Sequence, residues 1–287
     1  MNILKTGLLM ALMTFIFVVV GGALGGQGGM VMALGFALVG NLIAYYFSDK
    51  MVLAMYRARE LNPSEAPELF EIIERLTKKA QMPMPKVYLI PSETPNAFAT
   101  GRNPEHSAVA VTEGIYRLLP ARELEGVLAH ELAHIKHRDI LIGTIVGVMA
   151  GAISSLAWMA KWGAIFGGLG GRDREGDGGG AIGLLVLAIL APIIALLVQM
   201  AISRSREYHA DQKAGELTGD PRALASALEY IHRGIERHPM PEAGPATAHL
   251  FIASPLTAKS FFTLFSTHPA MEDRVARLEA QAQAMSR

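Results

Sequence analysis

The chain has 287 residues, of which 51% are hydrophobic and 18% are charged, whereas an average globular protein has roughly 25% charged residues. This composition excludes a mostly disordered chain, because such chains have few apolar residues and a high net charge. The absence of cysteine excludes disulfides, thiolate metal sites and a cysteine nucleophile. Basic and acidic residues are equal at 26 each, and the sequence has no phosphate loop, so neither nucleic acid nor ATP is indicated as a partner.

Charged residues are missing from whole blocks of the chain. None occurs from Thr6 to Ser48, a stretch that as a helix would be about twice the 30 Å hydrocarbon thickness of a bilayer. A glycine-rich run at 21–29 divides this block, so we predict two membrane-spanning helices over about 4–22 and 30–48 within a first segment, 1–48. A cleavable signal peptide is an alternative for the first of them.

Two further uncharged blocks, 140–160 and 181–203, each match one membrane thickness. We therefore predict four spans, with 140–203 holding the last two and a glycine-rich loop at 161–180. Buried helices of a soluble core are the alternative for these two blocks. Lys and Arg concentrate beside the polar segments 49–139 and 204–287, which predicts that both segments are cytoplasmic.

The two polar segments have the patterns of helices and short strands. In 49–139 we expect a helix around 69–80, a small sheet of three strands over 86–90, 97–99 and 108–111, and a helix that begins near Pro120 and continues without a break into the third apolar block. In 204–287 we expect the fourth span to continue as a helix, followed by a helix over about 221–234 and another from about Met271.

The strongest motif in the sequence is His130-Glu131-Leu132-Ala133-His134. On a helix the two histidines share one face, one turn apart, so both imidazoles can reach one zinc ion. The adjacent Glu131 is placed to accept a proton from a metal-activated water. A plain helix with surface histidines is the alternative for this short pattern.

A hydrolytic zinc site needs a third protein ligand. His137 lies about 10 Å along the helix axis from His130, too far for easy ligation, so we expect the ligand from another helix. Glu207, just after the fourth apolar block, is the candidate, and Asp211 shares its helix face and can accept the second N–H of a ligand histidine. An exposed acidic pair is the alternative for these two carboxylates.

These motifs together resemble the M48 family of membrane metallopeptidases. The resemblance rests on the apolar blocks and on four segments, namely Pro95–Gly101, the His130 motif, Arg206–Asp211 and Thr267–Pro269. It implies an α+β membrane protein with four transmembrane helices and a cytoplasmic, mainly α, zincin-like domain with a small β-sheet. This domain would consist of 49–139 and 204–287.

The resemblance also implies roles for individual residues. His130, His134 and Glu207 would hold one Zn²⁺ per subunit, and Glu131 would be the catalytic base. Asn96 and Ala97 would lie on an edge strand that pairs with the substrate backbone, and His268 would stabilise the oxyanion or act structurally. The family implies an endopeptidase that degrades misfolded membrane proteins in the bacterial inner membrane, linked to envelope or heat stress.

Two other functions stay open on the sequence alone. One is the processing of prenylated peptides, as in eukaryotic members of the family that have more spans. The other is a non-catalytic scaffold in which His137 completes a closed metal site. The same ligand trio also suits ferrous iron. The Pro-rich stretch 238–262, with His249, Leu250 and Phe251, is a candidate lid over the cleft.

Overall fold

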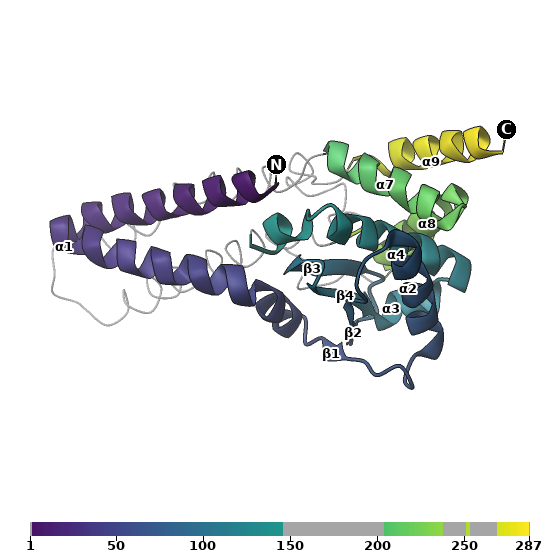
Figure 1. Cartoon of the computed structure of the whole chain (residues 1–287), viewed down its shortest axis with the longest axis horizontal. Coiled ribbons are helices and arrows are strands. Elements are labelled where there is room, and N and C mark those ends of the chain that lie inside the picture. Colours follow the sequence, from purple (N-terminus) through teal and green to yellow (C-terminus); the bar gives the residue numbers. More distant parts are fainter. Residues whose placement is uncertain (1, 146–203, 238–250, 253–268, 287) are drawn as a thin grey trace, which may run out of the picture.

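The computed structural model describes residues 2–145, 204–237, 251–252 and 269–286. A long helical hairpin extends from one side of a mixed helix-and-sheet body (Figure 1). The hairpin belongs to the N-terminal end of the chain, whereas the body combines the middle of the chain with its C-terminal part.

The hairpin is helix α1, Asn2–Met55, which folds back so that its two arms lie side by side (Figure 1). Gly26 has a φ of 56°, a left-handed conformation that glycine adopts without steric cost. The arms are joined by the Asn41 side-chain amide, which donates to the Met10 carbonyl at 3.2 Å and to the Thr14 hydroxyl at 2.8 Å. The two predicted N-terminal helices are therefore confirmed as helical.

The surface of α1 is strongly apolar. Within the described ranges one helix, Gly26–Met55, is long and apolar enough to cross a membrane. Large apolar side chains on both arms are exposed, among them Leu8, Phe15, Val31 and Phe36, and exposed apolar surface of this extent marks contact with a membrane or another protein. Of the two predicted spans over 140–160 and 181–203, only residues 140–145 belong to the described part of the chain.

The body contains a four-stranded sheet in the order β1-β2-β4-β3, formed by β1 (Arg59–Glu60), β2 (Lys86–Ile90), β3 (Ala97–Asn103) and β4 (His106–Thr112). The pairs β1–β2 and β3–β4 are antiparallel, whereas β2 and β4 are parallel. The last three strands match the predicted ones, although β3 and β4 extend further into their hairpin. The two-residue β1 was missed because Arg-Glu shows no apolar alternation. Strand β3 lies at the outer edge.

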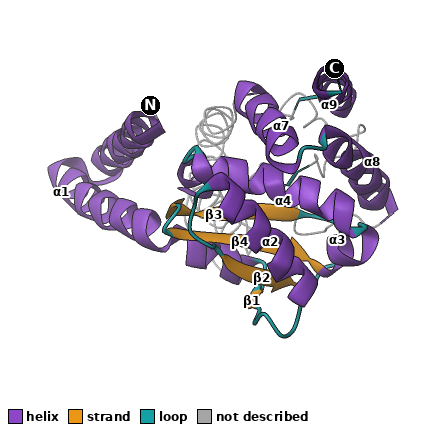
Figure 2. Ribbon diagram, turned by 45° about the vertical axis from the view of Figure 1, so that its right-hand side comes forward, coloured by secondary structure: helices purple, strands orange, loops and turns teal. Residues whose placement is uncertain are grey.

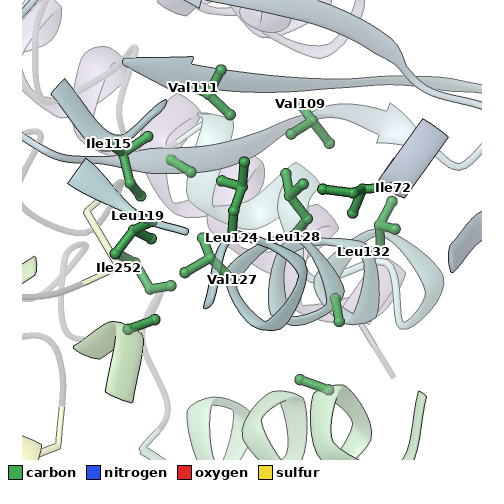
Figure 3. Packing of buried hydrophobic residues seen from close by; sticks show 14 of the residues in the cluster. Ile72, Val109, Val111, Ile115, Leu119, Leu124, Val127, Leu128, Leu132 and Ile252 are labelled. Carbon is green, nitrogen blue, oxygen red and sulfur yellow. The ribbon is translucent and has the colours of Figure 1, made fainter. Parts of the chain in front are cut away.

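Among the described residues the body also contains the helices α2 (Pro67–Ala80), α3 (Glu113–Leu118), α4 (Ala121–Lys136), α7 (Arg204–Thr218), α8 (Pro221–Arg237) and α9 (Met271–Met285). Helix α4 is central, because it contacts β3, α2, α7 and α8 (Figure 2). Its residues Leu124, Leu128 and Leu132 point toward Val109 and Val111 of β4 (Figure 3). All five are buried, and each fully buried side chain of this size contributes about 1.5–3 kcal/mol.

Helix α4 does not run into the third apolar block, so the prediction of an unbroken helix was wrong. Its end is a hydrogen-bonded cap in which Arg138 N–H donates to Ile135 O and Asp139 N–H donates to His134 O, both at 3.0 Å. This pattern normally uses glycine at the left-handed position, but here Arg138 has a φ of 57°. A new helix begins at Ile140, and the break places Asp139 beside His134.

Candidate metal centre

Helices α4 and α7 bring the three predicted ligands together. His130 and His134 lie one turn apart on α4, with 3.1 Å between their Nε2 atoms. Glu207 of α7 approaches from the side, with Oε2 3.7 Å from His130 Nε2 and Oε1 3.5 Å from His134 Nε2. Ligand atoms of the three residues all lie within 4.8 Å of one another, although Glu207 follows His130 by a long stretch of sequence.

This donor set fits a zinc ion. Two ligands on a tetrahedral zinc, at bond lengths of about 2.0–2.1 Å, lie about 3.3–3.4 Å apart, close to the separations found here. Two histidines and one carboxylate are typical of catalytic zinc, which keeps a fourth position for water. The side chains of His130 and Glu207 are buried, so an ion bound here would be largely shielded from solvent.

A carboxylate faces the second nitrogen of each histidine. Asp211 Oδ1 lies 2.9 Å from His130 Nδ1, and Asp139 Oδ2 lies 3.5 Å from His134 Nδ1. Such carboxylates favour the tautomer that carries its proton on Nδ1, which leaves Nε2 available to the metal. The structure thus places Asp211 beside His130 and Asp139 beside His134; sequence reasoning missed Asp139.

Arg274 of α9 holds Asp211 in place. Its Nε donates to Asp211 Oδ2 at 2.8 Å and its Nη2 donates to Oδ1 at 2.7 Å. Burial by itself would raise the pKa of Asp211, but the Arg274 guanidinium holds that pKa well below its usual range. The carboxylate is therefore ionised. Arg274 was also missed, because no local pattern connects a C-terminal arginine to Asp211.

Arg274 also reaches the edge of the sheet through Ile252. Its Nη1 donates to the Ile252 carbonyl at 2.7 Å, and the Ile252 N–H donates to Asn96 Oδ1 at 3.1 Å. Ile252 and Asn96 are both buried. A continuous chain of polar contacts therefore leads from the start of β3 to the metal ligand His130.

The backbone of Asn96 faces the neighbouring strand. Its carbonyl accepts from the Thr112 N–H at 2.9 Å, and its N–H donates to Thr112 Oγ1 at 2.9 Å. Because antiparallel pairs alternate in the direction of their hydrogen-bonding groups, the N–H and C=O of Ala97 and Ala99 face the outer edge. The structure therefore separates the two predicted residues: Ala97 lies at the outer edge of β3, and Asn96 holds Ile252.

Glu131 lies between the ligand cluster and this edge. Its Oε2 accepts a hydrogen bond from the Ala99 N–H at 2.9 Å, and its side chain is buried. Burial raises the pKa of Glu131 to about 7, which suits a group that must both accept and release a proton near neutral pH.

The pKa values of the two ligand histidines are shifted in opposite directions. Burial lowers the pKa of His130. Burial also acts to lower the pKa of His134, but the hydrogen bond to Asp139 and the charges of Glu207 and Glu131 outweigh it and raise that pKa to about 9. The carboxylates of the centre therefore provide a negative potential that favours a cation.

Other predicted residues are not part of this cluster. His137 contacts His209 of α7 instead, with 3.2 Å between their Nε2 atoms. His268 lies outside the described residues, as does most of the stretch 238–262. Phe251 and Ile252 of that stretch are both buried.

Comparisons with known proteins identify the family and several relatives of this chain. The model of peptidase family M48 matches residues 63–282. The "Protease HtpX homolog" of Desulfatibacillum aliphaticivorans is 56% identical over 96% of this chain and 89% of its own length. The protein of the same name from Syntrophobacter fumaroxidans is 52% identical over 96% of this chain and 98% of its own length.

A solved structure shares the fold. The crystal structure of S. mikatae Ste24p matches with a TM-score of 0.52 at 18% identity, covering 97% of this chain and 65% of that chain. At this level of identity the likeness concerns the fold alone. The family model, the relatives and the ligand cluster together show that the chain belongs to peptidase family M48.

Proposed function

We propose that this protein is a membrane-embedded, zinc-dependent endopeptidase that hydrolyses misfolded or damaged membrane proteins. The main support for this function is the position of Glu131, which lies between the ligand cluster and the outer edge of β3. This position supports a role for Glu131 as the base that acts on water beside a peptide paired with the strand. Zinc bound by His130, His134 and Glu207 would supply Lewis-acid polarisation of water and of the peptide carbonyl.

The residues of the chain supply the remaining chemistry. Glu131 accepts the proton of the attacking water and returns it to the leaving amine. The outward-facing backbone of Ala97 receives an extended substrate by adding a strand to the sheet, which selects unfolded segments because only these can adopt that conformation. His268 is proposed, from the family resemblance, to stabilise the oxyanion.

The site is close to the apolar hairpin. Tyr56, just beyond α1, packs against Phe98 of β3 with ring centroids 5.6 Å apart, and Val52, Leu53 and Phe251 belong to the same buried cluster. This contact supports a substrate strand held near the bilayer, where damaged membrane proteins would be accessible. We propose four spans, with 1–48 and 140–203 in a bacterial inner membrane and 49–139 and 204–287 in the cytoplasm, and a role in the stress response.

The decisive experiment uses the Glu131→Gln protein. Purified, zinc-loaded enzyme should cleave unfolded casein, and the variant should keep one zinc per chain while its cleavage rate falls by about 10²–10⁴-fold. Undiminished cleavage by the variant would refute the role of Glu131. Preference for a lipidated C-terminal peptide over casein would favour prenyl-peptide processing instead.

Zinc coordination separates the enzyme from a structural scaffold. X-ray absorption of the one-zinc protein should show three protein ligands and a water, because hydrolysis requires an open position. Four protein ligands would favour the scaffold. Metal analysis of the protein as purified distinguishes zinc from ferrous iron.

A further inference from the structure

A second pair of histidines lies beside the metal centre. His137 follows the ligand His134 by three residues at the end of α4, and His209 follows the ligand Glu207 by two residues on α7. Their Nε2 atoms are 3.2 Å apart and their ring centroids 4.7 Å apart. The same two helices thus bring together two histidine nitrogens outside the catalytic cluster.

The orientation of His137 directs a lone pair toward His209. His137 Nδ1 lies 2.7 Å from the Ala133 carbonyl oxygen, which can only accept a hydrogen bond, so Nδ1 carries the proton. A neutral imidazole protonated at Nδ1 has its lone pair on Nε2. This is the tautomer that the carboxylates favour at the two ligand histidines of the catalytic centre.

The separation of the nitrogens is that of ligands sharing one ion. Tetrahedral zinc–nitrogen bonds of about 2.0–2.1 Å place two nitrogens about 3.3–3.4 Å apart. The pair His137–His209 is at 3.2 Å, nearly the same as the 3.1 Å between the catalytic histidines His130 and His134. His209 is exposed, so an ion can reach the pair from solvent.

We propose that His137 and His209 form a second, solvent-accessible transition-metal site, which takes Zn²⁺ with water completing its coordination. Imidazole ligands suit zinc, nickel and copper, and having two protein ligands makes this site weaker than the catalytic one. Because α4 and α7 each also carry catalytic ligands, an ion here connects the two helices that build the active centre. Zinc at this site would therefore restrain their relative position.

The test is zinc stoichiometry on the untagged, full-length protein in detergent. The protein is equilibrated with zinc buffered from the nanomolar to the submillimolar range, and bound zinc is measured by mass spectrometry. We expect a tight first equivalent and a weaker second one. His209→Ala and His137→Gln should each lose the second equivalent and retain the first.

Matched variants distinguish this site from others. His106→Ala removes another exposed histidine, at the β3–β4 turn, and should keep both equivalents. His130→Ala should lose the tight equivalent while keeping the weak one, so a failure of the catalytic proposal is visible separately. A single equivalent in the wild-type protein overturns this proposal, as does a second equivalent that survives both His209→Ala and His137→Gln. In either case the pair would be joined by a hydrogen bond alone.

Discussion

Arg274 and Asp211 form a buried ion pair with two hydrogen bonds, at 2.7 and 2.8 Å, although they are 63 residues apart in the sequence. Asp211 in turn faces the Nδ1 of the metal ligand His130. The C-terminal helix α9 is therefore connected to the metal centre through Asp211, and Arg274 Nη1 also lies 4.0 Å from Oε2 of the ligand Glu207. Each partner has a side-chain exposure of 2–3%, so removal of one takes away the main opposite charge that faces the other in a dry environment.

Replacement of Arg274 should therefore be costly. Arg274→Met leaves the Asp211 carboxylate buried without its ion-pair partner, and we expect a loss of about 3–5 kcal/mol in the free energy of unfolding, measured by denaturant titration in detergent. The double variant Arg274→Met with Asp211→Asn should recover part of this loss. Arg222→Met, which breaks an exposed pair with Glu279 on the same helix α9, should change stability by at most about 1 kcal/mol. Equal losses in the two arginine variants would contradict the prediction.

Asp139→Asn should weaken zinc binding without unfolding the protein. The substitution removes the negative charge that faces His134 Nδ1, and loss of such a partner typically lowers metal affinity by about 10–100-fold. Affinity is measured by competition with a chromophoric chelator. Asp220→Asn is the control, because Asp220 pairs with Arg122 away from the centre. An unchanged affinity in Asp139→Asn would show that Asp139 does not orient the ligand.

Zinc binding should depend on pH through His134. Its pKa is raised to about 9, so below that pH zinc must displace one proton from this ring. Burial lowers the pKa of His130, so His130 releases no proton near neutral pH. The affinity of chelator-treated protein should therefore rise about tenfold per pH unit from pH 7 toward pH 9 and then level off. A flat profile over this range would contradict the raised pKa.

The raised pKa of His134 also affects the stability of the metal-free protein. A histidine whose pKa is higher in the folded protein stabilises the metal-free fold fully below its unfolded value of about 6.5. This contribution is lost as the pH rises through about 9. Thermal unfolding of chelator-treated protein should accordingly occur at a lower temperature at pH 9.5 than at pH 6.5 through the His134 contribution, and Asp139→Asn should reduce the difference.

Gly126 should be intolerant of any side chain. A Cβ at this position on α4 would lie 2.7 Å from the Leu224 backbone nitrogen of α8, so the two helices would have to separate. We expect Gly126→Ala to cost about 1–3 kcal/mol, as overpacking does. Gly215→Ala is the control, since the atoms nearest to its Cβ would be the flexible end of the Gln281 side chain. The prediction is checked by measuring the free energy of unfolding of both variants. Equal values would contradict a close contact between α4 and α8 at Gly126.

Local spacing alone made several elements and residues predictable. The spacing of His130 and His134 places both rings on one helix face in any α-helix, and alternation or apolar periodicity located β2, α2 and α8. These features depend on neighbours within one or two turns of the chain. For the same reason the strand and helix patterns survive in the structure with small changes at their ends.

Contacts between distant segments could not be predicted from the sequence. The cap that ends α4 depends on Arg138 in a left-handed conformation, which local preference assigns to glycine, so the break and the position of Asp139 could not be foreseen. The role of Asn96 was likewise hidden, because its partners Thr112 and Ile252 come from other segments.

The sequence by itself therefore determined the chemistry available to this protein: a helix with two histidines and a glutamate, a distant carboxylate, and apolar blocks of membrane length. The tertiary structure decided which groups act on one another. It placed Glu207 beside the histidines, Arg274 on Asp211, and the edge of β3 against Glu131. The physical reason is that these contacts gain their strength from burial, and burial depends on how distant segments pack.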